Sequence, residues 1–200
     1  GLFALILVGG VGACTVVGSG LRSYNILVDK DESVDAQWGQ VQNTYQRRND
    51  LVPNLVETVR GYAIHESETF TAVTEARAKV GQVNINANNL NPAMLAQFQQ
   101  SQGELSSALS RLMVVVEKYP ELKAIESFNR LMDEMAGTEN RVAVERMRFN
   151  EVAKDFNAYR NQFPTNVVAN YFQFGEKPYF EAEEAAKTAP KVDFKDLRKP

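Results

Sequence analysis

The sequence predicts an all-α protein in which an N-terminal transmembrane helix continues directly into a long antiparallel four-helix bundle. Three observations support this fold class. Residues 2–21 carry no charge. Apolar residues then recur in alternating steps of three and four, without the alternation of a strand. Prolines fall between the periodic segments. The predicted divisions are a transmembrane helix at 1–22, the bundle at 23–164 and an aromatic and charged C-terminal tail at 165–200.

The uncharged segment has the length that a helix needs to cross a bilayer. Gly9 and Ala13 are small residues four positions apart, so a second helix can approach closely there. Residues 11–14, which end at Cys14, also resemble a bacterial lipoprotein cleavage box. A membrane span and a lipidated N-terminus therefore stay open as alternatives.

From Tyr24 to Arg48 the apolar steps indicate a coiled-coil-like seam on a continuation of the same helix. Pro53 predicts a break, because proline fits the first turn of a new helix and disfavours helical geometry before it. Asn49 or Asp50 is a good cap for that start. We therefore expect a sharp turn near residue 50 and a second helix from there to about residue 83.

A loop is predicted at residues 81–91, where five asparagines gather. Asn91 and Pro92 then fit the cap and first position of a third helix. Pro120 ends that helix, and a fourth helix follows almost at once and runs to Pro164. This long fourth helix would reach the bilayer if it stayed straight, so we expect either a bend near Gly137 or a leaning bundle.

Charged residues on the second and fourth helices fall at similar levels when the chain is folded at these turns. They predict a structural band of interhelical ion pairs made of Glu75, Arg77, Lys79, Glu139, Arg141, Glu145, Arg146 and Arg148. Glu145 occupies a seam position, so its charge should be paired.

A second polar group lies at the predicted turn far from the membrane. Its members are Arg47, Arg48, Asn49, Asp50 and Asn54. Exposed turn residues can bind partners, and they can equally satisfy helix ends. Both interpretations are kept, the first as a candidate partner surface.

The stretches YQRRNDLVPNLVETV, GYAIHE, TENRVAVERMRFNE and FPTNVVA resemble the LemA family of bacterial single-span membrane proteins. The resemblance covers Tyr24 to Phe194. It implies a LemA-like bundle on a membrane anchor, in a family whose molecular role is poorly defined. It also suggests service to other membrane machinery, such as a membrane protease.

Motifs for catalysis are missing from the sequence. His65 has no second histidine one turn on, so the zinc-protease pattern is not met. Cys14 lies in the predicted span and makes a poor nucleophile. The net charge of −3 gives no reason to expect nucleic-acid binding. We therefore expect no enzyme activity, no metal and no cofactor.

The predicted function is a membrane-anchored helical scaffold or adaptor, self-assembling at the membrane surface. The alternative is a ligand-binding or lipoprotein-like module that uses a groove between helices. Its partners would be the lipid bilayer and further copies of the chain. The expected location is the bacterial inner membrane, in a single pass, with the bundle outside the cytoplasm because the flank after residue 22 lacks a positive excess.

The C-terminal tail returns to the membrane end and is rich in aromatic residues. Such rings are favoured at a bilayer interface, and they can also pack on a neighbouring subunit. The sequence favours the second interpretation, with candidate oligomer contacts at Gly9, Ala13, Tyr179, Phe180 and Phe194.

Overall fold

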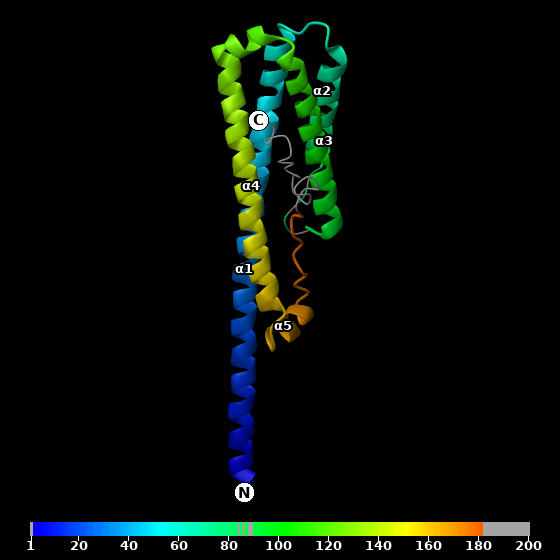
Figure 1. Ribbon diagram of the computed structural model, residues 1–200. Helices are drawn as coiled ribbons and strands as arrows, with labels where there is room; N and C mark the ends of the chain where they lie inside the picture. The colour runs from blue at the N-terminus through cyan, green and yellow to red at the C-terminus, as the bar shows by residue number, and fades with distance from the viewer. Residues whose placement is uncertain (1, 84, 86, 88–89, 182–200) are drawn as a thin grey trace, which may run out of the picture.

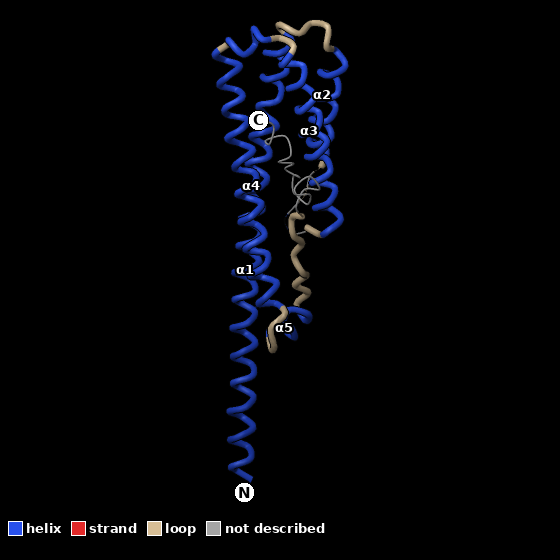
Figure 2. Tube along the Cα trace, in the orientation of Figure 1, coloured by secondary structure: helices blue, strands red, loops and turns tan. Residues whose placement is uncertain are grey.

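The computed structural model describes residues 2–83, 85, 87 and 90–181, with side chains described from residue 20 onward. These residues form only helices and loops (Figure 2). The helices in chain order are α1 (Leu2–Arg60), α2 (Ser67–Gln82), α3 (Pro92–Glu117), the 3-10 helix η2 (Pro120–Ala124), α4 (Glu126–Arg160) and α5 (Thr165–Tyr171).

The molecule is a long rod (Figure 1). Helix α1 runs along its whole length, and α4 lies beside α1. Helices α2 and α3 form a second pair along the half of the bundle farther from the N-terminus. The short helix α5 packs on α1 at the other end of α4.

The predicted turn near residue 50 is wrong, because Pro53 lies inside α1. A proline inside a helix costs about 3 kcal/mol, since it lacks an N–H and leaves the carbonyl four residues earlier without its donor. Here that carbonyl, of Asn49, accepts a hydrogen bond from Arg77 Nε of α2 at 3.1 Å. The apolar steps also continue through the proline, and burial of Val52 and Leu55 contributes about 1.5–3 kcal/mol each.

The turn falls instead at residues 61–66, where His65 is exposed. This shift removes the conflict over the length of the fourth helix. Helix α4 has 35 residues, or roughly 52 Å. The part of α1 after Arg22 ends at Arg60, which makes it roughly 57 Å long. The two helices therefore match in length, and neither a bend nor a lean is required.

The start of α3 is confirmed. The Asn91 side chain accepts a hydrogen bond from the Met94 N–H at 3.0 Å, and Pro92 opens the helix. Pro120 begins η2 rather than α4, and α4 follows from Glu126.

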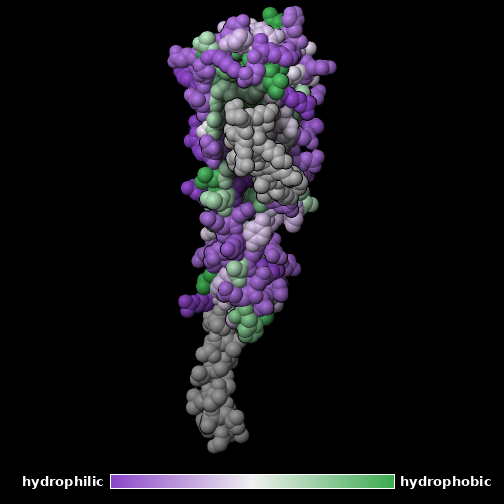
Figure 3. Space-filling model, viewed as in Figure 1, coloured by the Kyte–Doolittle hydropathy of each residue, from purple (hydrophilic) through white to green (hydrophobic). Residues whose placement is uncertain are grey.

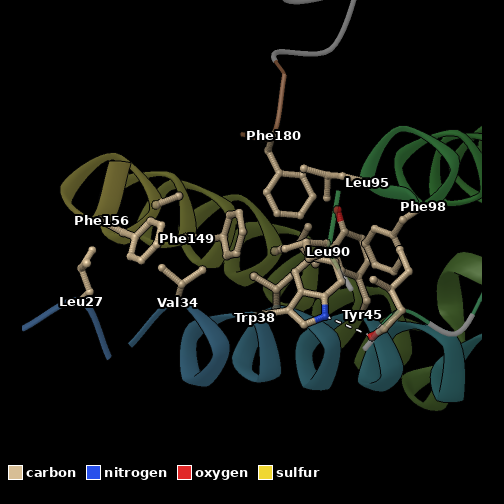
Figure 4. Packing of buried hydrophobic residues seen from close by; sticks show 14 of the residues in the cluster. Leu27, Val34, Trp38, Tyr45, Leu90, Leu95, Phe98, Phe149, Phe156 and Phe180 are labelled. Carbon is tan, nitrogen blue, oxygen red and sulfur yellow. Dashed lines mark hydrogen bonds between the residues drawn. The ribbon is translucent and has the colours of Figure 1, made fainter. Parts of the chain in front are cut away.

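Two hydrophobic cores follow each other along the rod. The distal core, far from the N-terminus, lies among α1, α2, α3, η2 and the first turns of α4, and it is mostly aliphatic. The proximal core lies among α1, α4, α5, the segment after α5 and the first turns of α3. It is rich in aromatic side chains, with Trp38 in edge contact with Phe98 and Phe149 and stacked on Phe180 (Figure 4).

The connection between α2 and α3 contributes to the proximal core. Ile85 is buried, and its carbonyl accepts a hydrogen bond from Trp38 Nε1 at 3.2 Å, the dashed line in Figure 4. The same carbonyl accepts a second hydrogen bond from Gln42 Nε2 at 2.8 Å. The polar composition that predicts a loop here thus includes two buried apolar residues, Ile85 and Leu90. The face seen in Figure 3 is mostly hydrophilic, with apolar residues in small separate groups.

Within the part of the chain whose side chains are described, no helix has an apolar stretch long enough to cross a membrane. The predicted span at 1–22 falls mainly on residues 1–19, which lie outside that part. Backbone helix is nevertheless continuous from Leu2 to Arg60.

Candidate functional site

The residues of the predicted ion-pair band have partners on several different helices. Lys79 of α2 pairs with Glu104 of α3 at 2.9 Å on an exposed face. This hydrogen-bonded pair raises the pKa of Lys79 and lowers the pKa of Glu104. Glu75 also favours the charged form of Lys79. Helix α2 packs chiefly on α3, which explains why its charges find partners there.

The α4 members of the band face α1, the surface or the C-terminal segment. Glu145 accepts a hydrogen bond from Gln37 Nε2 of α1 at 2.7 Å and pairs with Arg148 at 2.8 Å. Its carboxylate is therefore held on both sides. Arg141 is exposed, whereas Arg146 reaches the C-terminal segment described below.

Arg48 was expected on an exposed turn, but its side chain is buried between α1, α3 and α4. Its guanidinium pairs with Glu139 at 3.1 Å. It also donates to Gln102 Oε1 at 2.6 Å and to Ser106 Oγ at 3.2 Å, and it lies over the Tyr45 ring. The arginine therefore links three helices at one level of the bundle.

The other members of the predicted partner surface lie along α1 rather than at its end. Arg47 pairs with Glu134 at 2.9 Å, and Asp50 accepts a hydrogen bond from Gln46. Asn49 is buried beside α2, and Asn54 is exposed. These residues do not gather on one free surface, because α1 continues past them.

Among the candidate oligomer contacts, Phe180 is buried in the chain's own proximal core, with 6% of its surface exposed. Tyr179 is 43% exposed. Phe194 lies outside the described residues, and at Gly9 and Ala13 only the helical backbone is described. Phe180 thus packs in its own chain rather than on a neighbour.

Two asparagines of α4 hold the segment that contains Phe180. Asn157 Nδ2 donates to the Lys177 carbonyl at 2.8 Å, and its Oδ1 accepts from the Lys177 N–H at 2.9 Å. Asn150 makes the same pair of bonds with Phe180, at 3.0 and 2.8 Å. Each amide side chain therefore satisfies both backbone groups of one residue, as a neighbouring strand would.

The spacing of these contacts shows that the segment is extended. Asn150 and Asn157 are seven residues apart, or roughly 10.5 Å along a helix. Lys177 and Phe180 are three residues apart, which spans about 10 Å in an extended chain. At the ends, Arg160 Nε donates to the Phe174 carbonyl at 2.7 Å, and Arg146 donates to the Glu181 carbonyl at 2.7 Å. The segment from 174 to 181, here named the strap, thus runs antiparallel to α4.

A charged group fixes the strap to α1. Lys177 Nζ pairs with Asp31 and with Asp35, and the lysine also lies over the Phe156 ring. Burial raises the pKa of Asp35, and the negative charges of Asp31 and Glu32 add to this, against the opposing effect of Lys177. The pairing gives Asp31, a charged residue on an apolar seam, its partner within the same chain.

A groove runs beside the strap and continues past its end. Its volume is about 1210 Å³. One wall is α3, with Gln99, Gly103 and Ser107, and the other is α4, with Glu139 and Arg146. Tyr45 and Arg48 of α1 also line it, and the strap borders it from Glu176 to Glu181. Amide, hydroxyl and charged groups line the groove together with apolar residues such as Leu95 and Val142.

The sequence analysis missed the strap and its two asparagines. Their signal was present: Asn150 and Asn157 lie two helical turns apart on the buried side of α4, next to Phe149 and Phe156. A polar residue repeated at such a position needs a partner. That the partner is the backbone of residues after Gly175 depends on the tertiary structure alone.

The described fold is an all-α bundle of two long helices and a shorter helix pair, closed along its open side by its own C-terminal strap. The sequence profile of the LemA family matches residues 37–194, and the chain belongs to that family.

The relatives are bacterial proteins. Magnetosome protein MamQ 2 of Paramagnetospirillum magneticum is 24% identical over 92% of this chain and 74% of the relative. Magnetosome protein MamQ of Magnetospirillum gryphiswaldense is 25% identical over 84% and 68%. Protein LemA of Metamycoplasma hominis is 26% identical over 88% and 76%.

Proposed function

We propose that this protein is a membrane-anchored helical scaffold without catalytic activity of its own, assembled into homo-oligomers at the bacterial inner membrane. One observation carries the proposal. Exposed apolar side chains gather at the end of the bundle that adjoins the uncharged N-terminal segment. They are Leu21, Phe163, Val167, Tyr171 and Phe172.

The position of this group supports membrane contact. The ring of Phe172 lies 4.6 Å from that of Tyr24, one turn after Leu21 on α1. Tyr171 is 80% exposed and Phe163 is 83% exposed, which is costly in water for such large rings. Aromatic residues are favoured at the level of lipid headgroups. The group sits where a bilayer would begin if residues 2–21 crossed it.

The rigid connection supports a scaffold role. The uncharged segment and the bundle share α1, which runs without a break to Arg60. A span in such a helix would fix the direction of the whole rod relative to the membrane. Small residues four apart, Gly9 and Ala13, permit close contact between spans of neighbouring copies. We infer that self-association uses the span, since Phe180 is already packed within its own chain.

Labels at two exposed positions test the membrane contact. In a Cys14→Ser background, a polarity-sensitive fluorophore is attached to Tyr171→Cys or, as the control, to Ile64→Cys in the turn after α1. Both native residues are exposed, at 80% and 74%. In lipid nanodiscs the label at 171 should shift to the blue and the label at 64 should not. Equal spectra would contradict the interfacial position.

The anchor is tested separately by placing lysines at Val8 and Val11. Charges in the middle of a span are costly, so the variant should leave the membrane fraction after alkaline carbonate washing. Retention equal to the wild type would refute the anchor. Light scattering in detergent tests assembly, and a monomer at all concentrations would refute it. Cleavage of the bundle by protease added to spheroplasts is expected for a bundle outside the cytoplasm.

A second candidate function is a ligand-binding module, and the groove of about 1210 Å³ between α3 and α4 favours it. A co-purified small molecule in this groove would support the candidate over the scaffold. Mass spectrometry of the organic extract of the purified protein is the measurement.

A further inference from the structure

We propose that the groove between α3 and α4 is a docking site for an extended, basic segment of a partner protein, which pairs with the exposed backbone edge of the strap. The inference goes beyond anchoring and self-assembly and depends on neither. It competes with the small-ligand candidate, because both need the same space.

The strap uses only one side of its backbone to bind α4. The bonded residues recur every three positions: side chains of α4 bond the carbonyl of Phe174 and both backbone groups of Lys177 and of Phe180. Three residues per turn is the repeat of the polyproline II conformation. The backbone groups of the intervening residues therefore point away from the asparagines of α4.

These intervening residues leave a second edge of the strap open. Glu176 and Tyr179 are exposed, and both line the groove. Among the described residues, neither the N–H nor the C=O of Glu176 or Tyr179 makes a hydrogen bond. An exposed extended edge is a template on which another chain can pair. Such pairing gives affinity through main-chain hydrogen bonds, with little demand on the side chains of the partner.

The opposite wall of the groove already binds peptide backbone. Gln99 Nε2 of α3 donates to the Glu181 carbonyl at 3.2 Å, and Arg146 of α4 donates to the same carbonyl at 2.7 Å. Figure 1 shows the strap, in orange, rising from α5 toward the beginning of α3. Gln100 and Ser107 also line the α3 wall. A chain that lies beside the strap would therefore have amide and hydroxyl groups along its outer edge.

The groove has the length and the room for a short extended segment. Its lining residues on α3 run from Pro92 to Ser110, roughly 27 Å along the helix. About eight extended residues cover this distance. Gly103 lies in this wall and has nothing within 4 Å of the position of a Cβ, so a neighbouring backbone has room to approach.

The charges around the groove favour a basic occupant. Carboxylates outnumber cations among the lining residues and their ion-pair partners, with Glu139, Glu176, Glu181, Asp31 and Asp35 against Arg48, Arg146 and Lys177. The Arg48 guanidinium is buried against Glu139, and Lys177 is held by the two aspartates. Glu176 and Glu181 are exposed. Lysine or arginine side chains on the occupant would complement this surplus of negative charge.

Peptide binding to the full chain tests the proposal. The probe is a fluorescent octapeptide in which lysine and threonine alternate, titrated onto the protein in a non-ionic detergent and followed by anisotropy. We expect saturable binding. An analogue with glutamate in place of lysine should bind several-fold more weakly. An analogue with every backbone N–H methylated keeps its charge but loses the main-chain donors, so it should bind several-fold more weakly too.

A pair of glycine variants locates the binding. Gly103→Leu places a side chain in the groove and should weaken binding of the octapeptide several-fold. Gly39→Leu is the matched control, because Gly39 also lies within a helix, has nothing within 4 Å of a Cβ and does not line the groove. It should leave binding unchanged. Both variants replace a helical glycine, so a general effect on the helices would appear in both.

The other outcomes overturn the proposal. Equal binding of the methylated and unmodified peptides would mean attraction between charges alone. Equal effects of the two leucine variants would place the peptide elsewhere. Failure of the octapeptide to bind would refute the docking site. Binding only to a chain that ends at Glu181 would give the groove to the remainder of the chain itself rather than to a partner.

Discussion

The distal and proximal cores show two ways to cover the same pair of long helices, α1 and α4. In the distal core, α2, α3 and η2 cover α1 and the beginning of α4, and the buried side chains are mostly Val and Leu. In the proximal core α3 contributes only its first turns, through Leu95 and Phe98, and α5 and the strap cover the rest of the long helices. There the rings of Trp38, Phe149 and Phe180 are buried against one another.

The difference follows from the needs of the backbone. Helices satisfy their own N–H and C=O groups, so the distal core can be almost entirely apolar. An extended segment has no such internal bonds, and its buried backbone groups need partners. The proximal core therefore includes Asn150 and Asn157 among its aromatic rings, and they supply these partners. A single extended segment can replace a helix pair only when the remaining helices provide these groups.

The largest expected effect comes from breaking the proximal core at its centre. Trp38→Ala should destabilise the protein by about 3–5 kcal/mol, because the ring is 1% exposed and contacts three other rings. Hydrogen exchange by mass spectrometry should show loss of protection in the strap.

Leu112→Ala in the distal core is the matched comparison. It should cost about 2–5 kcal/mol while strap protection stays at the wild-type level. Equal loss of strap protection in both variants would mean that the two cores form one cooperative unit.

The second-largest effect is expected at the Asn49 carbonyl, which has no donor within the helix because Pro53 lacks an N–H. Arg77→Ala removes the donor to the buried Asn49 carbonyl and should cost about 1–3 kcal/mol in denaturant unfolding. In a Pro53→Ala background the restored N–H can serve that carbonyl, so the same change should cost less. Equal costs in both backgrounds would contradict this link between α1 and α2.

Asp35 gives a prediction about pH. Burial, the first cause, raises its pKa above 3.8, so the folded protein binds the proton more tightly than the unfolded chain does. The contribution of Asp35 to stability is thus greatest at low pH and falls as pH rises from 3.8 through the raised pKa. Asp35→Asn should show a smaller decrease in the free energy of unfolding over this window.

Asp31, Glu32 and Lys177 face the same carboxylate and remain in this variant. Identical pH profiles for the variant and the wild type would count against burial as the cause of the raised pKa of Asp35.

The smallest effect is expected at the exposed pair of Lys79 and Glu104 on the distal half. Exposed pairs contribute little because solvent screens them and their side chains lose freedom. Lys79→Gln should leave the melting temperature nearly unchanged at moderate salt. A clear drop that persists at high salt would show that this pair helps to dock α2 on α3.

The sequence determined the helices and the faces that they bury, because both depend on local periodicity. The steps of three and four mark Val34, Trp38 and Val41 as buried, and Asn91 with Pro92 marks the start of α3. The same steps pass through Pro53 without a change of phase, which was the signal that α1 continues.

The tertiary structure alone decided how long-range partners combine. Whether a proline breaks a helix depended on Arg77, 24 positions later in the sequence, which serves the freed carbonyl. The place of the strap depended on Asn150 and Asn157, whose backbone partners lack any local pattern. Such contacts join residues far apart in the chain, and only the packing of the helices brings them within hydrogen-bond distance.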